Sequence, residues 1–269
     1  MPATLYHYTR LETLQKIIES GIIHATHYAS FEDKDELTLG IGRLLEAVRK
    51  HPVKERDIDY RDFLIQVIEG FREGRLREGG LKVYVLSLTE IQDSHHHWEN
   101  YGDVAIGFPG EMIHKGFFVS MKHPFPGADE NELRPKPAHR TTCRYDGTFD
   151  LAAFVADRFF NPRNYPTKFR HRGCDGWTAA SLSVSVYLAI CSIKGSEFLQ
   201  EDEIRCMQIN PDDCEYPVKV EGDRRFIEMR FDPATYIQEL WVGPNCDRAD
   251  CEALIRQWNN DGKLNSRLK

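Results

Sequence analysis

The first 21 residues constrain the fold most, because their periodicity changes from strand to helix at one point. Residues 5–8 are a short aromatic run with no breaker, which predicts a strand. Apolar residues then recur at helical spacing from Leu11 to Ile18, and Gly21 provides a stop signal. We therefore expect His7 near a helix N-terminus, where free amides and the helix dipole favour an anion such as phosphate.

Thr9 and Glu12 have the spacing of a capping box at the start of this helix. In a capping box the two side chains accept hydrogen bonds from backbone N–H groups that the first turn leaves unpaired. The sequence thus predicts Thr9 as the N-cap residue. A carboxylate at Glu12 already occupies part of the positive helix end, which weakens the expectation of a bound phosphate.

Length and charge limit the class of protein. A chain of 269 residues with 41% hydrophobic residues can bury a substantial core, as one domain or a domain with an insertion. The net charge of −7 argues against a general polyanion binder. Residues 134–172 nevertheless contain nine Lys or Arg against three Asp, a surplus of six positive charges. Such a stretch suits a nucleic acid or an acidic partner, although a charge run is more commonly a solvated face.

Cysteine usage and hydropathy indicate the compartment. The seven cysteines are an odd number, include no C-x-x-C pair and show no zinc-ligand spacing. Together with the lack of a charged-then-apolar leader, this predicts a reduced, cytoplasmic protein. The longest weakly polar run, residues 181–193, is too short to span a bilayer, so we expect no membrane association.

The remaining periodicity predicts an α+β fold in a single domain that spans residues 1–269. We expect further strands at 22–28, 83–89, 104–108, 117–121, 141–145, 226–231 and 237–242, and helices at 37–50, 60–76, 151–160, 178–193 and 248–262. Asp93 or Ser94 can cap a short helix that ends at Gly102. The helical pair within residues 37–80 reads as an insertion. We expect a strand from residue 201. Alternate side chains of a strand point to the same face, so Glu201, Glu203 and Arg205 would share one face.

Several short motifs together carry a family resemblance. They are Leu5-Tyr6-His7-Tyr8-Thr9 with Gly21, the acidic loop from Asp33 to Glu36, Leu86-Ser87-Leu88, Trp98-x-x-Tyr101-Gly102, Glu201-x-Glu203-Ile204-Arg205 and Val242-Gly243-Pro244. In this combination the chain resembles, nearly end to end, the bacterial family catalogued as domain of unknown function 2971, although Ile204 stands where that family usually has Trp. The layout also resembles the ADP-ribosyltransferase superfamily, which implies a split β-sheet core with flanking helices.

The superfamily resemblance implies specific roles for individual residues. His7 would hold a ribose hydroxyl of NAD, Tyr101 or alternatively Trp98 would stack on the nicotinamide, and Glu203 would be the catalytic carboxylate. The resemblance also implies NAD contacts at Tyr8, Thr9, Ser87 and Arg205, and acceptor contacts at Glu201, Arg170 and Arg172. NAD would be the substrate, and no metal is expected.

The chemistry explains why these residue types are suited to the reaction. Breaking the nicotinamide–ribose bond develops positive charge on the sugar, as in glycoside hydrolysis. A fixed carboxylate such as Glu203 stabilises that charge, and preorganised electrostatics is usually the largest contribution to catalysis. An aromatic face binds the departing ring. Arg205 can pair with Glu203 or contact the pyrophosphate.

Each assignment also has a purely structural interpretation. His7 can be a core histidine bonded to a neighbouring strand. Tyr101 and Trp98 can be ordinary packing residues of a short helix. Glu203 and Arg205 can form a surface pair that contributes little to stability.

Two other functional classes fit parts of the sequence. A metal-dependent nuclease would use Asp33, Asp35, Glu36, His24 and His27, whose oxygen and imidazole ligands suit Mg²⁺ or Mn²⁺. An inactive binding module would use only the basic stretch. Sensitivity to chelator separates the nuclease from the transferase.

The sequence thus leads to one principal hypothesis. It is an NAD-dependent ADP-ribosyltransferase that modifies a macromolecule, either RNA or DNA or a protein. A bacterial toxin or defence effector, with an antitoxin partner, is a role compatible with that activity.

Overall fold

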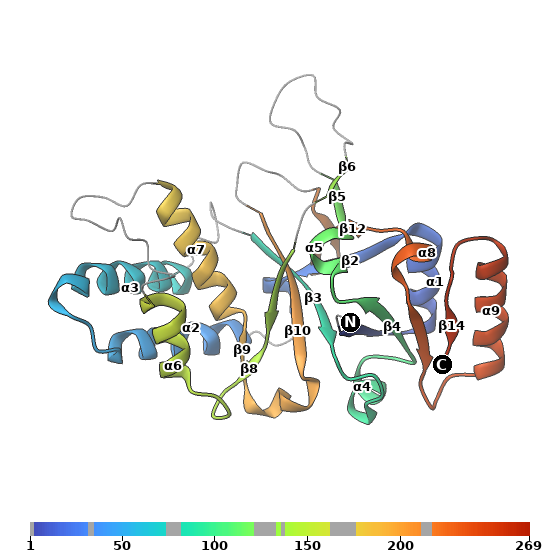
Figure 1. Cartoon of the computed structure of the whole chain (residues 1–269), viewed down its shortest axis with the longest axis horizontal. Helices are drawn as coiled ribbons and strands as arrows, with labels where there is room; N and C mark the ends of the chain where they lie inside the picture. Colours follow the sequence, from blue (N-terminus) through green and yellow to red (C-terminus); the bar gives the residue numbers. More distant parts are fainter. Residues whose placement is uncertain are drawn as a thin grey trace, which may run out of the picture. The chain divides into compact units, whose positions relative to one another are not determined.

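The computed structural model describes residues 3–31, 35–73, 82–120, 133–135, 138–161, 176–210 and 217–269. In these ranges the chain is a mixed α/β protein with an open, largely antiparallel sheet (Figure 1). It divides into two compact units. The sheet unit comprises Met1–Phe31, Val83–Thr142 and Gln200–Lys269, and the helical unit comprises Glu32–Lys82 and Cys143–Leu199. The segment 37–80, predicted as an insertion, lies within the first segment of the helical unit, and residues 143–199 supply the second.

The sheet has twelve strands in the described part of the chain. They are β1 (Thr4–Thr9), β2 (Ile22–His27), β3 (Lys82–Thr89), β4 (Val104–Pro109), β5 (Phe118–Ser120), β6 (Leu133–Pro135), β7 (His139–Thr142), β10 (Glu203–Asn210), β11 (Lys219–Glu221), β12 (Arg224–Arg230), β13 (Glu239–Val242) and β14 (Arg267–Leu268). The main path runs β14-β13-β4-β1-β3-β2-β12-β5-β6, while β10 joins β3 to β7 and β11 pairs with β12.

Strand β3 is the point at which the sheet branches. It pairs with β2 at Tyr84 and Val85, with β1 at Thr89, and with β10. A strand has only two edges, so two of these three partners share one edge. Strands β2 and β1 meet opposite ends of β3, and the backbone between them, around Ser87, lies where the sheet divides.

One face of the sheet carries the main hydrophobic core. Alternate residues of neighbouring strands point into it, including Leu5, Leu86, Ile106, Ile204 and Ile227. Helix α1 (Leu11–Ser20) covers this core with Leu14, Ile17 and Ile18, as the helical spacing predicted. On β3 and β10 the alternate residues, which include Ser87, Glu203 and Arg205, therefore lie on the opposite face.

The ends of α1 match the sequence prediction only in part. Gly21 is in the left-handed conformation with φ 64° and donates its N–H to Ile17 O, so the predicted stop is confirmed. The predicted capping box is wrong. The N-cap residue is Arg10, without a side-chain cap, because Thr9 is the last residue of β1 and is buried there.

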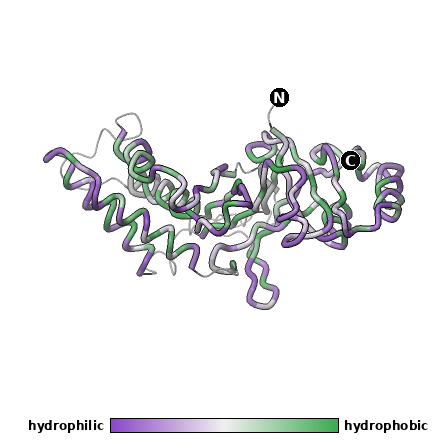
Figure 2. Tube along the Cα trace, turned by 90° about the horizontal axis from the view of Figure 1, so that it is seen from below, coloured by the Kyte–Doolittle hydropathy of each residue, from purple (hydrophilic) through white to green (hydrophobic). Residues whose placement is uncertain are grey.

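Shorter elements complete the sheet unit. They are η1 (Tyr28–Ser30), α4 (His95–Asn100), α5 (Met112–Lys115), η4 (Ser196–Glu201), which ends in this unit, α8 (Pro233–Tyr236) and α9 (Arg248–Asn260). Helix α9, at the red end of the colour bar, alternates hydrophilic and hydrophobic residues along its turns (Figures 1 and 2). It buries Cys251, Ile255 and Trp258, and Asp247 caps its start.

The helical unit is built from α2 (Asp35–Lys50), α3 (Ile58–Arg72), α6 (Leu151–Val155) and α7 (Gly176–Ile190), with η2 (Glu55–Asp57) and η3 (Ala156–Phe160). Its small sheet pairs β8 (Arg144–Tyr145) with β9 (Ile193–Lys194) in parallel. Helices α2 and α7 approach closely, since a Cβ on Gly40 would lie 2.3 Å from Ile190 O. The rings of Phe71 and Tyr187 pack edge to face with centroids 3.9 Å apart.

Two predicted strands differ from the structure. The segment 141–145 is divided between β7 and β8, which belong to different units. The strand predicted from residue 201 begins only at Glu203, because Glu201 ends η4 and Asp202 has a positive φ of 40°. Among the described helices, none is both long enough and apolar enough to cross a membrane.

Candidate functional site

Ser87 connects two of the predicted catalytic residues at the branch of the sheet. Its side chain is on the polar face of β3, and its hydroxyl donates a hydrogen bond to Glu203 Oε1 on β10. Its backbone oxygen lies 3.1 Å from His7 Nδ1 on β1. A histidine and a glutamate that are 196 positions apart in the sequence are thus joined through one serine.

Glu203 and Arg205 form a buried ion pair on β10. Both side chains are on the polar face, and the whole residues are only 4% and 2% exposed. Arg205 Nε donates to Glu203 Oε1 at 3.1 Å and one of its terminal nitrogens donates to Oε2 at 3.0 Å. The interpretation as a solvated surface pair is therefore wrong. The two-point contact fixes the plane of the carboxylate in the sheet unit.

The guanidinium of Arg205 also lies 5.6 Å from the ring centroid of Phe31. Its two hydrogen bonds to Glu203 make Arg205 a positioning residue for that carboxylate. The alternative role from the sequence, contact with a pyrophosphate, would require these bonds to be released.

His7 is on β1, one residue after Tyr6, which pairs with Thr89 of β3. Since a carbonyl oxygen can only accept, Nδ1 of His7 carries the proton and donates to Ser87 O. In the neutral ring Nε2 is then an acceptor. Burial lowers the pKa of His7, and the positive charge of Arg224 lowers it further, against the opposing effect of the Ser87 contact. The ring is therefore held as a neutral hydrogen-bond acceptor at Nε2.

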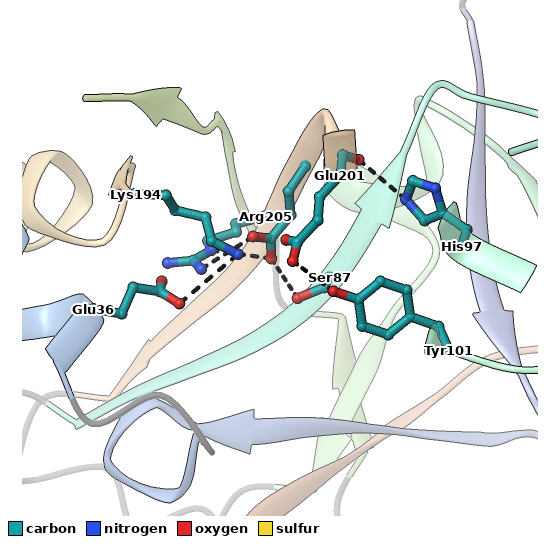
Figure 3. A network of polar contacts seen from close by, with 8 residues as sticks. Glu36, Ser87, His97, Tyr101, Lys194, Glu201 and Arg205 are labelled. Atoms are coloured by element: carbon teal, nitrogen blue, oxygen red, sulfur yellow. Dashed lines mark hydrogen bonds and ion pairs between the residues drawn. The ribbon is translucent and has the colours of Figure 1, made fainter. Parts of the chain in front are cut away.

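Tyr101 and Glu201 add a second polar contact beside this chain (Figure 3). The Tyr101 hydroxyl donates to Glu201 Oε1 at 2.5 Å, and the ring is 43% exposed. Figure 3 shows the Tyr101 hydroxyl directed toward Glu201, on the side where Ser87 lies. Glu201 itself is buried. The sequence grouped Glu201 with Glu203 on one strand face, whereas the structure brings it to Tyr101 from the preceding turn.

His97 anchors this contact from α4. Its Nε2 lies 3.1 Å from Glu201 O, so the neutral ring carries its proton on Nε2 and donates to that carbonyl. Its Nδ1 is buried and has no hydrogen-bond partner among the described residues. Burial, followed by the nearby His96, lowers the pKa of His97. Sequence reasoning missed this role, for which no local signal exists.

Trp98 and Tyr8 lie in a separate aromatic cluster. Their rings pack edge to face with centroids 4.6 Å apart, and both residues are at most 7% exposed. The Trp98 indole donates to Asp93 and the Tyr8 hydroxyl donates to Ile91 O. Of the two candidates for stacking on a nicotinamide, Tyr101 therefore exposes its ring and Trp98 does not. Tyr8 serves packing rather than contact with a ligand.

Gly102 explains how α4 is held against β1. Its φ is 142°, and a Cβ there would lie 2.3 Å from the carbonyl carbon and oxygen of Thr9. Only glycine permits this approach, which places Tyr101 next to the strand that carries His7. Thr9 is enclosed by the same contact, and its predicted role in binding NAD has no exposed side chain to support it.

Backbone strain marks the turn between the two glutamates. Asp202, with φ of 40°, is the single non-glycine residue with positive φ in the described chain. Its carbonyl accepts a hydrogen bond from Thr89 Oγ1 at 3.2 Å, which holds the turn against β3. Strain of this kind persists where surrounding contacts fix it. Here it lets Glu201 and Glu203 reach Tyr101 and Ser87 respectively.

Of the remaining sequence-predicted residues, some lie outside the described part of the chain, and His24 and His27 pack against aromatic rings. Arg170 and Arg172 lie outside the described residues, as does Asp33. His24 stacks on Phe226 with centroids 4.0 Å apart, and His27 packs against Tyr84. In the described part of the chain, no three His, Cys, Asp or Glu side chains gather in a way that could hold a metal ion.

Comparison of the chain with protein-family models, with curated proteins and with solved structures found no match. The site is accordingly interpreted from its own geometry.

That geometry combines four chemical elements in the sheet unit. A fixed, buried carboxylate is provided by Glu203, a hydroxyl bound to it by Ser87, a neutral imidazole acceptor on the Ser87 backbone oxygen by His7, and an exposed aromatic residue by Tyr101. A carboxylate and an imidazole acceptor can bind vicinal hydroxyls of a sugar, and the ring can stack on a flat heterocycle. The arrangement is suited to a nucleoside-like substrate.

Proposed function

We propose that the protein is an NAD-dependent ADP-ribosyltransferase that transfers ADP-ribose to a macromolecule. The observation that carries this proposal is the chain His7–Ser87–Glu203, which links β1, β3 and β10 at the branch of the sheet. The branched antiparallel sheet supports an ADP-ribosyltransferase-like fold, and the motif resemblance to the family with domain of unknown function 2971 supports the same assignment.

Each residue has a role that follows from its contacts. Glu203 would stabilise the positive charge that develops on the ribose as the bond to nicotinamide breaks. Arg205 and Ser87 hold that carboxylate in one orientation. His7 Nε2 would accept a hydrogen bond from a ribose hydroxyl, and Tyr101 would stack on the nicotinamide ring.

The acceptor is the second substrate of the proposed reaction. Glu201 precedes Glu203 by two residues and accepts a hydrogen bond from Tyr101, and in this proposal it would orient the acceptor group. The basic stretch 134–172 favours an acceptor with negative charge, such as RNA or DNA, and a protein acceptor is the alternative. A role as a cytoplasmic toxin or defence effector, held inactive by an antitoxin, is compatible with this chemistry.

Transfer is tested with NAD labelled in its adenylate half. The wild-type protein, incubated with labelled NAD and a bacterial lysate, is expected to label a macromolecule, and nuclease or protease digestion then identifies the acceptor class. Glu203→Gln keeps the shape of the side chain and should abolish labelling. Glu252→Gln, at an exposed position on α9, is the matched control and should label normally.

Two results would remove the proposal. The first is equal labelling by the wild type and Glu203→Gln when both are folded by circular dichroism. The second is release of free ADP-ribose without any labelled macromolecule in every lysate fraction, which would indicate NAD hydrolysis instead of transfer. Labelling that survives EDTA argues further against a metal-dependent reaction.

A further inference from the structure

Arg224 stands out on the polar face of the sheet, at the start of β12. Its Nε and one terminal nitrogen donate to Thr26 Oγ1 at 3.2 and 3.0 Å, and its guanidinium carbon lies 5.4 Å from the ring centroid of Phe226. The residue is exposed. These contacts hold the cation in one place without covering its remaining N–H groups.

Strand register places Arg224 on the same face as the Ser87 side chain. Ile227 and Met229 of β12 point into the core, so Arg224 and Phe226 point the other way. Phe226 is directly opposite Thr26 of β2, and Thr26 is directly opposite Val85 of β3. Residues directly opposite each other share a face, and Ser87 is two residues beyond Val85.

The separation between Arg224 and the site is short. Thr26 and Ser87 are diagonal neighbours on adjacent strands, a spacing of roughly 7–8 Å in an antiparallel sheet. The charge of Arg224 acts on His7, whose pKa it lowers, and on His24. Arg224 therefore lies within electrostatic reach of the histidine that is bound to Ser87.

Arg224 makes no close ion pair with a carboxylate of the described residues. Among the described residues no carboxylate lies within 4.0 Å of its guanidinium, although Glu221 is directly opposite it on β11. Glu228 on the same face is paired with Lys219 and Arg230, at 3.1 and 3.3 Å. Glu228 is thus engaged by two other cations, and within the described part of the chain Arg224 has Glu221 only as a more distant cross-strand neighbour.

The backbone around Arg224 is also fixed in advance. Ser30 Oγ donates to Asp223 O and accepts from Arg225 N, so both neighbours of Arg224 are tied to one residue of η1. Gly222, with φ of 59°, makes the tight turn between β11 and β12. A planar guanidinium that is already immobilised loses little entropy when it binds a ligand.

From these contacts we infer that Arg224 and Thr26 form a phosphate-binding subsite next to His7. A guanidinium binds phosphate oxygens through two parallel N–H groups, a geometry that no other side chain provides. The phosphate can come from the pyrophosphate of a dinucleotide or from the backbone of a nucleic-acid acceptor. Sequence reasoning gave the phosphate role to Arg205, whose N–H groups are taken by Glu203. This inference rests on the proposed function for its choice of ligand, but it is tested by measuring binding and not transfer.

Binding is measured by calorimetry with inorganic pyrophosphate, ADP-ribose and a short single-stranded RNA as separate probes. Arg224→Gln should weaken at least one of them about tenfold or more, the loss typical of a charge-assisted hydrogen bond. Arg224→Lys keeps the positive charge but lacks the two parallel N–H groups of the guanidinium, so it should recover only part of the affinity. Arg225→Gln is the matched control, because Arg225 is an exposed arginine one position along on the other face, and it should bind like the wild type.

The three probes distinguish the source of the phosphate. Loss of pyrophosphate and ADP-ribose binding with RNA binding intact assigns the subsite to the dinucleotide, and the reverse pattern assigns it to the acceptor. Equal affinities of wild type, Arg224→Gln and Arg225→Gln for all probes would overturn the inference, as would failure of the wild type to bind any of them. If Glu203→Gln still transfers ADP-ribose, the proposed function is lost, while Arg224-dependent binding of pyrophosphate would still support the subsite.

Discussion

The carbonyl oxygen of Ser87 lies 3.1 Å from His7 Nδ1, at the part of β3 between its pairings with β2 and with β1. This contact ties β1 to β3 beyond their pairing at Tyr6 and Thr89. His7 thus has a structural role in holding β1 against β3, beside its proposed role in binding a ribose hydroxyl.

Removing the Ser87 hydroxyl tests its role in positioning Glu203. Ser87→Ala should lower kcat for NAD cleavage by about tenfold and the free energy of unfolding by only about 1 kcal/mol, the net worth of one hydrogen bond. Single-turnover cleavage of NAD and urea unfolding measure the two quantities. A variant with wild-type kcat would show that Arg205 alone is sufficient to orient the carboxylate.

The buried pair Glu203–Arg205 should behave as a coupled unit. Arg205→Ala leaves a buried carboxylate without its cation and is expected to cost roughly 3–5 kcal/mol of unfolding free energy. Adding Glu203→Ala should cost less than the sum of the two single changes, by about 0.5–3 kcal/mol. A double-mutant cycle by denaturant unfolding measures this coupling, and strict additivity would contradict it. The solvated pair Arg248–Glu252 on α9 serves as the control and should show little coupling.

Gly102 should be far less tolerant of a side chain than Gly147. Both have positive φ, of 142° and 75°, but nothing lies within 4 Å of a Cβ on Gly147, whereas a Cβ on Gly102 would collide with the Thr9 backbone. Gly147→Ala should cost about 1–2 kcal/mol of unfolding free energy from the backbone conformation alone. Gly102→Ala should cost roughly 1–3 kcal/mol more, through displacement of β1 from α4. Thermal or urea unfolding compares the two, and equal losses would exclude the steric explanation.

His97 should make the fold less stable in mild acid. Its pKa is lowered from the ordinary value of 6.5 by burial and by His96, so the unfolded chain binds this proton more readily than the folded chain. The free energy of unfolding must then fall as the pH drops below 6.5. His7, His24 and His51 shift in the same direction and add to the effect.

Urea unfolding between neutral and mildly acidic pH measures this slope. His97→Gln, whose amide can still donate to Glu201 O, should reduce the slope without abolishing it. His95→Gln, at a histidine with 83% of its side chain accessible, is the control for replacing an exposed histidine of the same helix. An unchanged slope in His97→Gln would show that the ring is charged in the folded protein.

Several parts of the fold could be predicted from the sequence because they depend on neighbours in the chain. Alternation along 83–89 and helical spacing from Leu11 to Ile18 identify β3 and α1, and Gly21 ends that helix through its own conformational freedom. Ser94 caps α4 as one of the two predicted candidates. The capping box at Thr9 failed, since pairing of Thr9 with Val104 on β4 extends β1 by one residue.

The candidate site could be predicted from the sequence in part, and the rest depends on the tertiary structure. The sequence by itself determined which residue types are available, with His7 on β1, Ser87 on β3, and Glu203 and Arg205 on one face of β10. Only the tertiary structure decided that Ser87 joins His7 to Glu203, that Trp98 is enclosed while Tyr101 is exposed, and that Arg224 reaches Thr26. The reason is physical: period two is a local property of one strand, whereas pairing of strands and burial of side chains depend on contacts between segments up to about two hundred residues apart.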